Sequence, residues 1–137
     1  MKSRSESLIR LKKFQVDEKR RQVAQIEMMI ADFERMAGDL DQQIEIEHTK
    51  TGISDVAHFA YSTFAKAALQ RRDNLLASAA DMKGKLEAAQ DTLAEAIEDL
   101  KKVELLDQRE YQREKDEQLK QEQAEYDEIG RLRFRSN

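Results

Sequence analysis

The sequence contains no cysteine and no proline, and only four of its 137 residues are glycine. Without cysteine, the chain forms neither a disulfide nor a thiolate metal site. Without proline, no position forces a break in an α-helix by removing a backbone amide donor. These absences favour long, uninterrupted helices.

Long apolar segments are also missing. The longest purely apolar run is residues 28–31, far below the roughly 20 residues that span a membrane. The first residues, MKSRSESLIRLKK, lack the apolar core of a secretory signal. We therefore expect a cytosolic protein without direct membrane insertion.

What is abundant is charge, at 38% of residues against 39% hydrophobic, with a formal net charge of -4. Charge this dense leaves too little apolar surface for the thick core of a compact globule. The apolar residues nevertheless recur regularly, which is not typical of a disordered chain. The richness in Ala, Glu, Lys, Leu and Arg predicts coiled coil, and the length suits one domain, 1–137.

The first half repeats apolar residues every seven positions, as a coiled-coil seam requires. One seam position holds Ile9, Val16, Val23, Ile30, Ala37 and Ile44. The companion position holds Ile26, Phe33 and Leu40 after the polar Lys12 and Lys19. The predicted seam is therefore weak near the N-terminus and stronger from Val23 onward.

The second half repeats this design. One position holds Ala68, Leu75, Met82, Ala89, Ala96 and Val103, and its companion holds Ala79, Leu86, Leu93 and Leu100. The next companion positions are Asp107 and Glu114, so the seam is expected to end near residue 106. The sequence nevertheless remains compatible with helix up to Gly130.

A turn is predicted between the halves. Gly52 can adopt the left-handed conformation that ends a helix, and Lys50 suits the negative helix end. Ser54 can cap a second helix, with Asp55 at its positive end. We predict helix one over about 1–50, a turn over about 51–54, helix two over about 55–130 and a frayed basic tail, 131–137.

The predicted fold is therefore all-α: an antiparallel two-helix coiled-coil hairpin whose longer second helix overhangs the first. With the turn near residue 52, residues whose numbers sum to about 104 are expected to face each other. Both seams then end at the same level, and about 25 residues of helix two have no partner in helix one.

No motif predicts catalysis. The sequence has no glycine-rich phosphate loop, no HExxH pattern and no cysteine nucleophile. His48 and His58 flank the turn, but with Asp55 they supply too few ligands, so we interpret them as solvated. We expect no catalytic, cofactor or metal site, and no enzyme.

A basic start is the first candidate binding region, because residues 1–21 carry a net charge of +5. Its candidate contacts are Arg10, Lys12, Lys13, Lys19, Arg20 and Arg21. A solvated helix face, docking to an acidic protein surface, a nucleic-acid patch and a membrane-surface helix with a short apolar face all fit this pattern. The interrupting Asp17 and Glu18, and the acidic remainder of the chain, argue against nucleic acid.

An aromatic cluster is the second candidate region, formed by Phe59, Tyr61 and Phe64. On a helix Phe59 and Tyr61 lie about 200° apart, so at least one ring is expected to be exposed and available to a partner. A sparse apolar stripe of Leu119, Tyr126 and Ile129 on the overhang is a third candidate surface.

These features together resemble FliJ, the small component of the bacterial flagellar type III export apparatus, in its alphaproteobacterial form. The resemblance covers nearly the whole chain. It includes SLIRLKKFQVDEKRRQ, the heptads of IEMMIADFERMAGDL, the turn TGISD, HFAYSTFAKAALQRRDNL and the long charged second helix.

The resemblance implies a stalk-like coiled coil that binds and stimulates the flagellar export ATPase ring. It also implies contacts with the cytoplasmic domain of the export gate membrane protein and with export chaperones, at the cytoplasmic face of the inner membrane. The basic start, with Leu119 and Tyr126, is then expected to contact the ring, and the aromatic cluster the gate.

Two alternatives remain open. One is a generic coiled-coil adaptor, which as a four-helix dimer would bury the alanine-rich faces more completely than a single hairpin. An export-substrate chaperone would instead bind unfolded subunits through the apolar stripe of the overhang.

Overall fold

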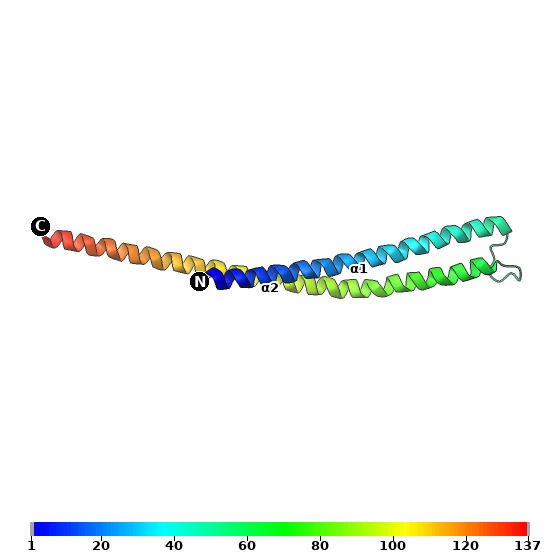
Figure 1. Cartoon of the computed structure of the whole chain (residues 1–137), viewed down its shortest axis with the longest axis horizontal. Helices are drawn as coiled ribbons and strands as arrows, with labels where there is room; N and C mark the ends of the chain where they lie inside the picture. The colour runs from blue at the N-terminus through cyan, green and yellow to red at the C-terminus, as the bar shows by residue number, and fades with distance from the viewer. Residues whose placement is uncertain (1, 137) are drawn as a thin grey trace. The chain divides into compact units, whose positions relative to one another are not determined.

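The computed structural model describes the backbone of residues 2–136 and the side chains of residues 5–135. It contains two helices, α1 (Lys2–Thr51) and α2 (Thr63–Ser136), joined by a loop over residues 52–62. The described residues include no strand. The predicted all-α helical hairpin is thus confirmed (Figure 1).

The structure divides into two compact units. The hairpin unit, residues 16–95, holds the connecting loop and the helix segments that flank it. The other unit, which we call the terminal unit, holds residues 1–15 and 96–137. The expectation of a single domain over 1–137 stays a prediction.

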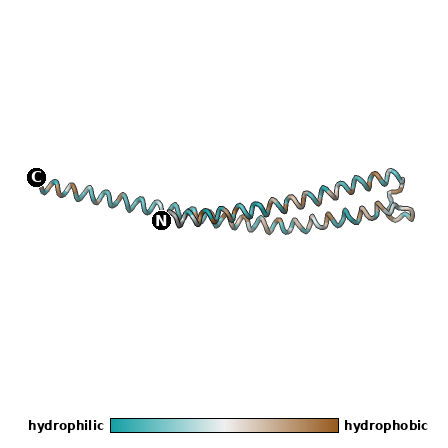
Figure 2. The backbone as a smooth tube through the Cα atoms, in the orientation of Figure 1, coloured by the Kyte–Doolittle hydropathy of each residue, from teal (hydrophilic) through white to brown (hydrophobic). Residues whose placement is uncertain are grey.

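In the hairpin unit, the core follows the predicted seam and extends it to Ala65. Its buried positions are Val16, Val23, Ile30, Ala37, Leu40, Ile44, Ala65, Ala68, Ala79 and Met82. Hydrophobic residues, coloured brown, recur along both helices in Figure 2. Leu40, Ile44 and Ala68 form one buried cluster, against which Leu69 and Leu75 pack. Small alanines facing large aliphatic residues allow the two helices to approach closely.

In the terminal unit, the seam fades as predicted. Ile9 is half-buried and lines a shallow hollow with residues of α2 that include Lys101, Glu104 and Leu105. Asp107 is the last half-buried residue of α2, and every described side chain from 108 to 135 is exposed. The predicted unpartnered end of α2 is therefore present.

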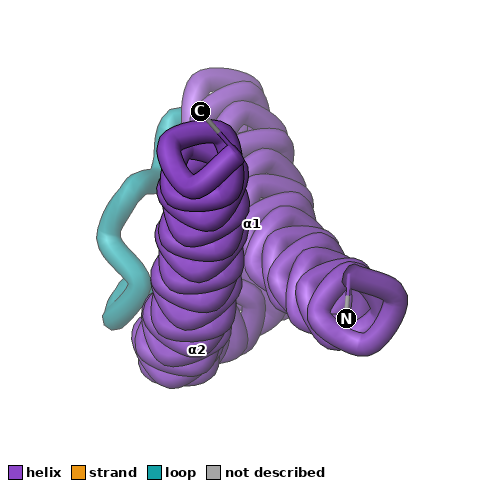
Figure 3. The backbone as a smooth tube through the Cα atoms, turned by 90° about the vertical axis from the view of Figure 1, so that its left-hand side faces the viewer, coloured by secondary structure: helices purple, strands orange, loops and turns teal. Residues whose placement is uncertain are grey.

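The predicted turn over 51–54 and the start of helix two at 55 were wrong, because the loop extends to residue 62 (Figure 3). Asp55 does not lead into a helix. Its carboxylate accepts a hydrogen bond from the Ala57 amide at 3.0 Å, and its carbonyl accepts one from the His58 amide at 3.0 Å. Such local bonds compete with helix formation.

The cap of α2 is Ser62 and not Ser54. The Ser62 hydroxyl accepts a hydrogen bond from the Ala65 amide at 3.2 Å and donates one to the Glu47 carboxylate at 2.9 Å. The Lys66 amide then donates to the Ser62 carbonyl at 3.0 Å. Gly52 does take the predicted left-handed conformation, with φ at 71°.

The longer loop shifts the register between the helices. The numbers of the paired residues Glu47 and Ser62 sum to 109. Those of Asp41 and Arg72 sum to 113, and those of Glu34 and Lys83 to 117. The expected sum of about 104 was therefore too low, by roughly the number of residues added to the loop.

The predicted fraying after Gly130 was also wrong, because α2 continues to Ser136. Gly130 does not adopt a positive φ, so it does not end the helix. A glycine inside a helix costs only about 1 kcal/mol relative to alanine. Arg131 and Glu128 pair across this point at 3.6 Å.

We predict that Ile44→Ala lowers the free energy of unfolding by about 2–4 kcal/mol, because it empties a position in the buried cluster. Urea unfolding followed by circular dichroism measures this change. The matched control is Ile46→Ala, on the same helix but 66% exposed, which should cost less than about 0.5 kcal/mol. Equal losses for both variants would contradict the described seam.

The cap assignment makes a second prediction. Ser62→Ala should lower the free energy of unfolding by about 1 kcal/mol, because the Ala65 amide loses its acceptor. Ser54→Ala removes a hydroxyl that caps no helix and should have little effect. The same urea experiment distinguishes them, and a larger loss for Ser54→Ala would restore the original assignment.

Candidate interaction surfaces

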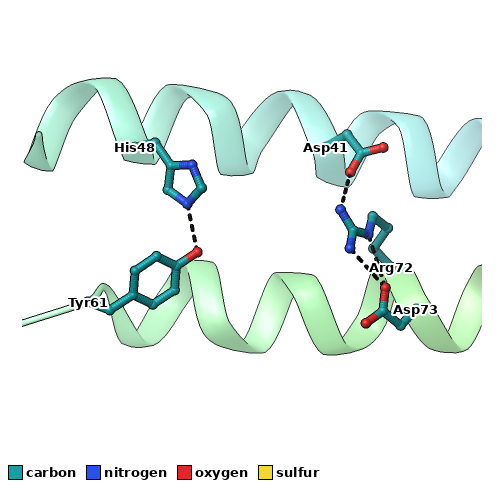
Figure 4. A network of polar contacts seen from close by, with 5 residues as sticks. All are labelled: Asp41, His48, Tyr61, Arg72 and Asp73. Atoms are coloured by element: carbon teal, nitrogen blue, oxygen red, sulfur yellow. Dashed lines mark hydrogen bonds and ion pairs between the residues drawn. The ribbon is translucent and has the colours of Figure 1, made fainter. Parts of the chain in front are cut away.

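The three aromatic residues of the predicted cluster lie at the tip of the hairpin unit and differ in exposure. Phe59 is 97% exposed and Phe64 is 54% exposed. Tyr61 is half-buried, and its hydroxyl lies 2.6 Å from His48 Nε2 (Figure 4). The prediction that at least one ring is exposed is confirmed. The helical argument behind it was wrong, because Phe59 and Tyr61 lie in the loop.

Of the two histidines predicted to be solvated, His58 is exposed as expected and His48 is not. His48 is half-buried, and its ring tilts against that of Tyr61 with centroids 5.5 Å apart. His58 is exposed, stacks on Phe59 at 4.8 Å and accepts a hydrogen bond from the Ala60 amide at its Nδ1. Both rings therefore shape the loop, and His58 supports the exposed Phe59 ring.

Below the tip, Arg72 holds the two helices in register. Its guanidinium lies 2.9 Å from Asp41 of α1 and 3.0 Å from Asp73 of its own helix (Figure 4). The hydrogen bonds to Asp41 and then to Asp73 raise the pKa of Arg72 above its ordinary value. The arginine is half-buried, while the two carboxylates are exposed. This contact fixes where the tip lies relative to the seam.

The basic start is mostly open to solvent. Arg10, Lys13, Arg20 and Arg21 are exposed, while Lys12 and Lys19 are half-buried at seam positions. Arg10, Lys12 and Lys13 belong to the terminal unit, and the other three belong to the hairpin unit. Arg20 lies 4.0 Å from Asp17 in an exposed pair, which neutralises little of this charge.

The unpartnered end of α2 carries the apolar stripe. Leu119 is 57% exposed and Tyr126 is 71% exposed. These residues are one heptad apart, so they lie on the same face of the helix. The exposed Ile129 adds to this face, one turn beyond Tyr126. The face is available to a partner, and Tyr126 also lines a shallow, open hollow with Gly130 and Phe134.

Sequence reasoning gave no weight to exposed apolar residues inside the hairpin unit, chiefly Met29 and Met36. Both lie beside the seam, where periodicity alone does not show which side of the seam α2 leaves exposed.

No group of three or more potential metal ligands occurs among the described residues. Among the same residues, neither helix contains a stretch apolar enough to cross a membrane.

Comparison with known proteins gives a match to a protein family. No curated protein and no solved structure matches this chain. A family model does, under the description Flagellar FliJ protein, over residues 1–137. Since this match covers the whole sequence, the chain belongs to the FliJ family, whose members are components of the flagellar export apparatus.

Proposed function

We propose that this chain is a non-catalytic stalk that binds and stimulates the flagellar export ATPase ring and links it to the export gate. The observation that carries the proposal is the match of residues 1–137 to the FliJ family. The arrangement of two long helices supports it, because such a structure offers extended exposed surfaces to partners.

The proposed contacts with the ring are the basic start and the unpartnered end of α2. Arg10, Lys13, Arg20 and Arg21 are exposed cations, and Leu119 and Tyr126 are exposed apolar residues. Cations suit an acidic lining and speed association, while apolar anchors slow dissociation. Lys12 and Lys19, being half-buried, contribute less than the four exposed cations.

The proposed contact with the cytoplasmic domain of the export gate protein is the loop tip. Phe59 stands free of the helices, with His58 stacked on it, and Phe64 is exposed at the start of α2. An exposed aromatic ring loses little conformational entropy on docking and buries a large area. Tyr61 takes a supporting role, because its hydroxyl is engaged by His48.

Two further parts of the proposal follow from the family alone. Export chaperones are proposed as additional partners, and the site of action is proposed to be the cytoplasmic face of the inner membrane at the flagellar base. No nucleic acid is included, because the chain is acidic outside its first 21 residues and its last eight.

The ring contact predicts that Lys13→Glu with Arg21→Glu weakens stimulation of the export ATPase. The double variant should require about tenfold more chain for half-maximal stimulation, because two exposed cations become anions. Steady-state ATP hydrolysis with assembled rings measures this effect. The matched control, Lys50→Glu with Lys66→Glu, reverses two exposed lysines near the loop and should leave stimulation unchanged.

Deletion of residues 1–21 tests the same contact more severely, and stimulation should disappear. If assembled rings respond equally to the full chain, the truncation and the charge variants, the basic start has no part in the contact. If the rings do not respond even to the full chain, the adaptor function becomes the better explanation.

The gate contact predicts that Phe59→Ala with Phe64→Ala lowers affinity for the cytoplasmic domain of the gate protein by about tenfold or more. Calorimetry measures the affinity, and ATPase stimulation should be unchanged in the same variant. Phe134→Ala is the control, since this ring is 86% exposed near the other end of α2. Unchanged gate affinity in the double variant would remove the tip from the proposal.

A further inference from the structure

The connecting loop, drawn in teal in Figure 3, contains two successive turns of the same design. In the first, the Asp55 carboxylate accepts a hydrogen bond from the Ala57 amide, and the Asp55 carbonyl accepts one from the His58 amide. In the second, Nδ1 of the His58 ring accepts from the Ala60 amide, and the His58 carbonyl accepts from the Tyr61 amide. All four distances are 3.0 Å. The second turn is therefore an Asx-type turn in which an imidazole takes the place of a carboxylate.

The two acceptors respond differently to protons. A carboxylate remains an acceptor throughout the neutral pH range, whereas an imidazole nitrogen accepts a hydrogen bond only while it carries no proton. Since Nδ1 of His58 accepts from the Ala60 amide, the His58 ring is neutral here, with its proton on Nε2. A proton on Nδ1 would place two N–H donors against each other. The second turn therefore keeps its side-chain bond only while His58 is neutral.

The second turn also determines where the Phe59 ring lies. Phe59 and Ala60 are the two central residues of the turn that begins at His58. The Phe59 side chain is 97% exposed, and its ring stacks on that of His58 with centroids 4.8 Å apart and planes 21° apart. Among the described residues, His58 supplies the one ring that Phe59 contacts. The most exposed aromatic ring of the tip is thus held by a residue whose acceptor a proton removes.

Charged and titratable groups lie on every element that meets at the tip. They are Glu47, His48 and Lys50 at the end of α1, Asp55 and Tyr61 on the loop, and Lys66 at the start of α2. No ion pair joins His58 to any of them in the described part of the chain. The nearest carboxylate, that of Asp55, already accepts from the Ala57 amide. Because the His58 side chain is exposed, solvent protons reach it directly.

The other histidine of the tip does not share this sensitivity. His48 Nε2 lies 2.6 Å from the Tyr61 hydroxyl. A neutral His48 can accept a hydrogen bond from this hydroxyl, and a protonated His48 can donate one to its oxygen. Ser62 is held to Glu47 by a separate bond of 2.9 Å. A proton on either histidine therefore leaves the loop attached to α1, and only a proton on His58 changes the apex of the loop.

We propose that His58 is a proton-sensitive switch of the tip, which keeps Phe59 in its docking position while the ring is neutral and releases it on protonation. The switch rests on the proposed function, because it makes contact with the export gate protein depend on pH. Two effects of the proton act in the same direction. The Ala60 amide loses its acceptor, so the turn that carries Phe59 is weakened. The ring beside Phe59 also becomes a cation, and burying an unpaired charge in an apolar partner site is unfavourable.

The switch can be tested on the full chain without any partner. A hydrogen bond from the Ala60 amide to His58 Nδ1 gives a nitrogen–nitrogen scalar coupling in the NMR spectrum of isotope-labelled protein. This coupling should be present at about pH 8 and absent at about pH 5.5, because histidine side chains gain a proton in this range. The matched control is the Ala57 amide, whose chemical shift should change far less, since its acceptor is a carboxylate.

Two results of this experiment would overturn the switch. One is a spectrum without the coupling at about pH 8, because the bond would then be missing in the neutral state. The other is a coupling that persists at the pH where the ring signals show His58 to be fully protonated.

Calorimetry with the cytoplasmic domain of the export gate protein measures the consequence for docking. The unchanged chain should bind about fivefold more weakly at about pH 5.5 than at about pH 8. In His58→Asn, the side-chain oxygen can accept from the Ala60 amide and takes up no proton in this range. Its affinity should therefore fall less than about twofold. Titration of the gate domain itself affects both chains equally, so the comparison between them isolates His58.

His48→Gln is the matched control, because it removes the other histidine of the tip and should keep the pH dependence of the unchanged chain. If His58→Asn loses affinity at low pH as strongly as the unchanged chain and His48→Gln, the switch does not control docking. A full chain that fails to bind the gate domain at about pH 8 contradicts the proposed function instead, and the nitrogen–nitrogen coupling still decides whether His58 responds to the proton as described.

Discussion

The apolar seam between two antiparallel helices is the constraint on which the rest of this structure depends. A pair of helices has no interior beyond that seam, so burial is confined to one stripe on each helix. The polar contacts across it, such as Arg72 with Asp41 and Lys83 with Glu34, involve exposed carboxylates and add little free energy. Their effect is to select one register. Recognition must then take place on the outer surfaces.

The seam was predictable because a heptad repeat is a local property of the sequence. Gly52 was predictable for the same reason, since its positive φ is a local requirement of the helix end. The start of α2 was not, because Ser54 and Ser62 carry the same capping hydroxyl. What distinguishes Ser62 is its hydrogen bond to Glu47, 15 residues away, and a distant partner is not visible in a local pattern.

The candidate surfaces also divide into features that local sequence predicts and features that depend on distant residues. Composition and charge located the basic start and the aromatic cluster, but the different roles of Phe59 and Tyr61 depend on His48, which lies 13 residues before Tyr61. The exposure of Met29 and Met36 could not be predicted from the heptad pattern. It follows from the pair of Glu34 with Lys83, which shows which side of α1 is covered by α2. Surfaces that depend on the register between two helices therefore cannot be identified from the sequence alone.

The exposed end of α2 has a consequence for the lifetime of the protein. From residue 108 to 135 the helix has only exposed side chains, with local contacts such as Gln112 with Asp116 and Gln123 with Asp127. A helix supported in this way opens at a small cost, and proteases cleave the open form. A partner that covers this segment slows its cleavage. The cellular amount of the chain is then expected to follow the amount of that partner.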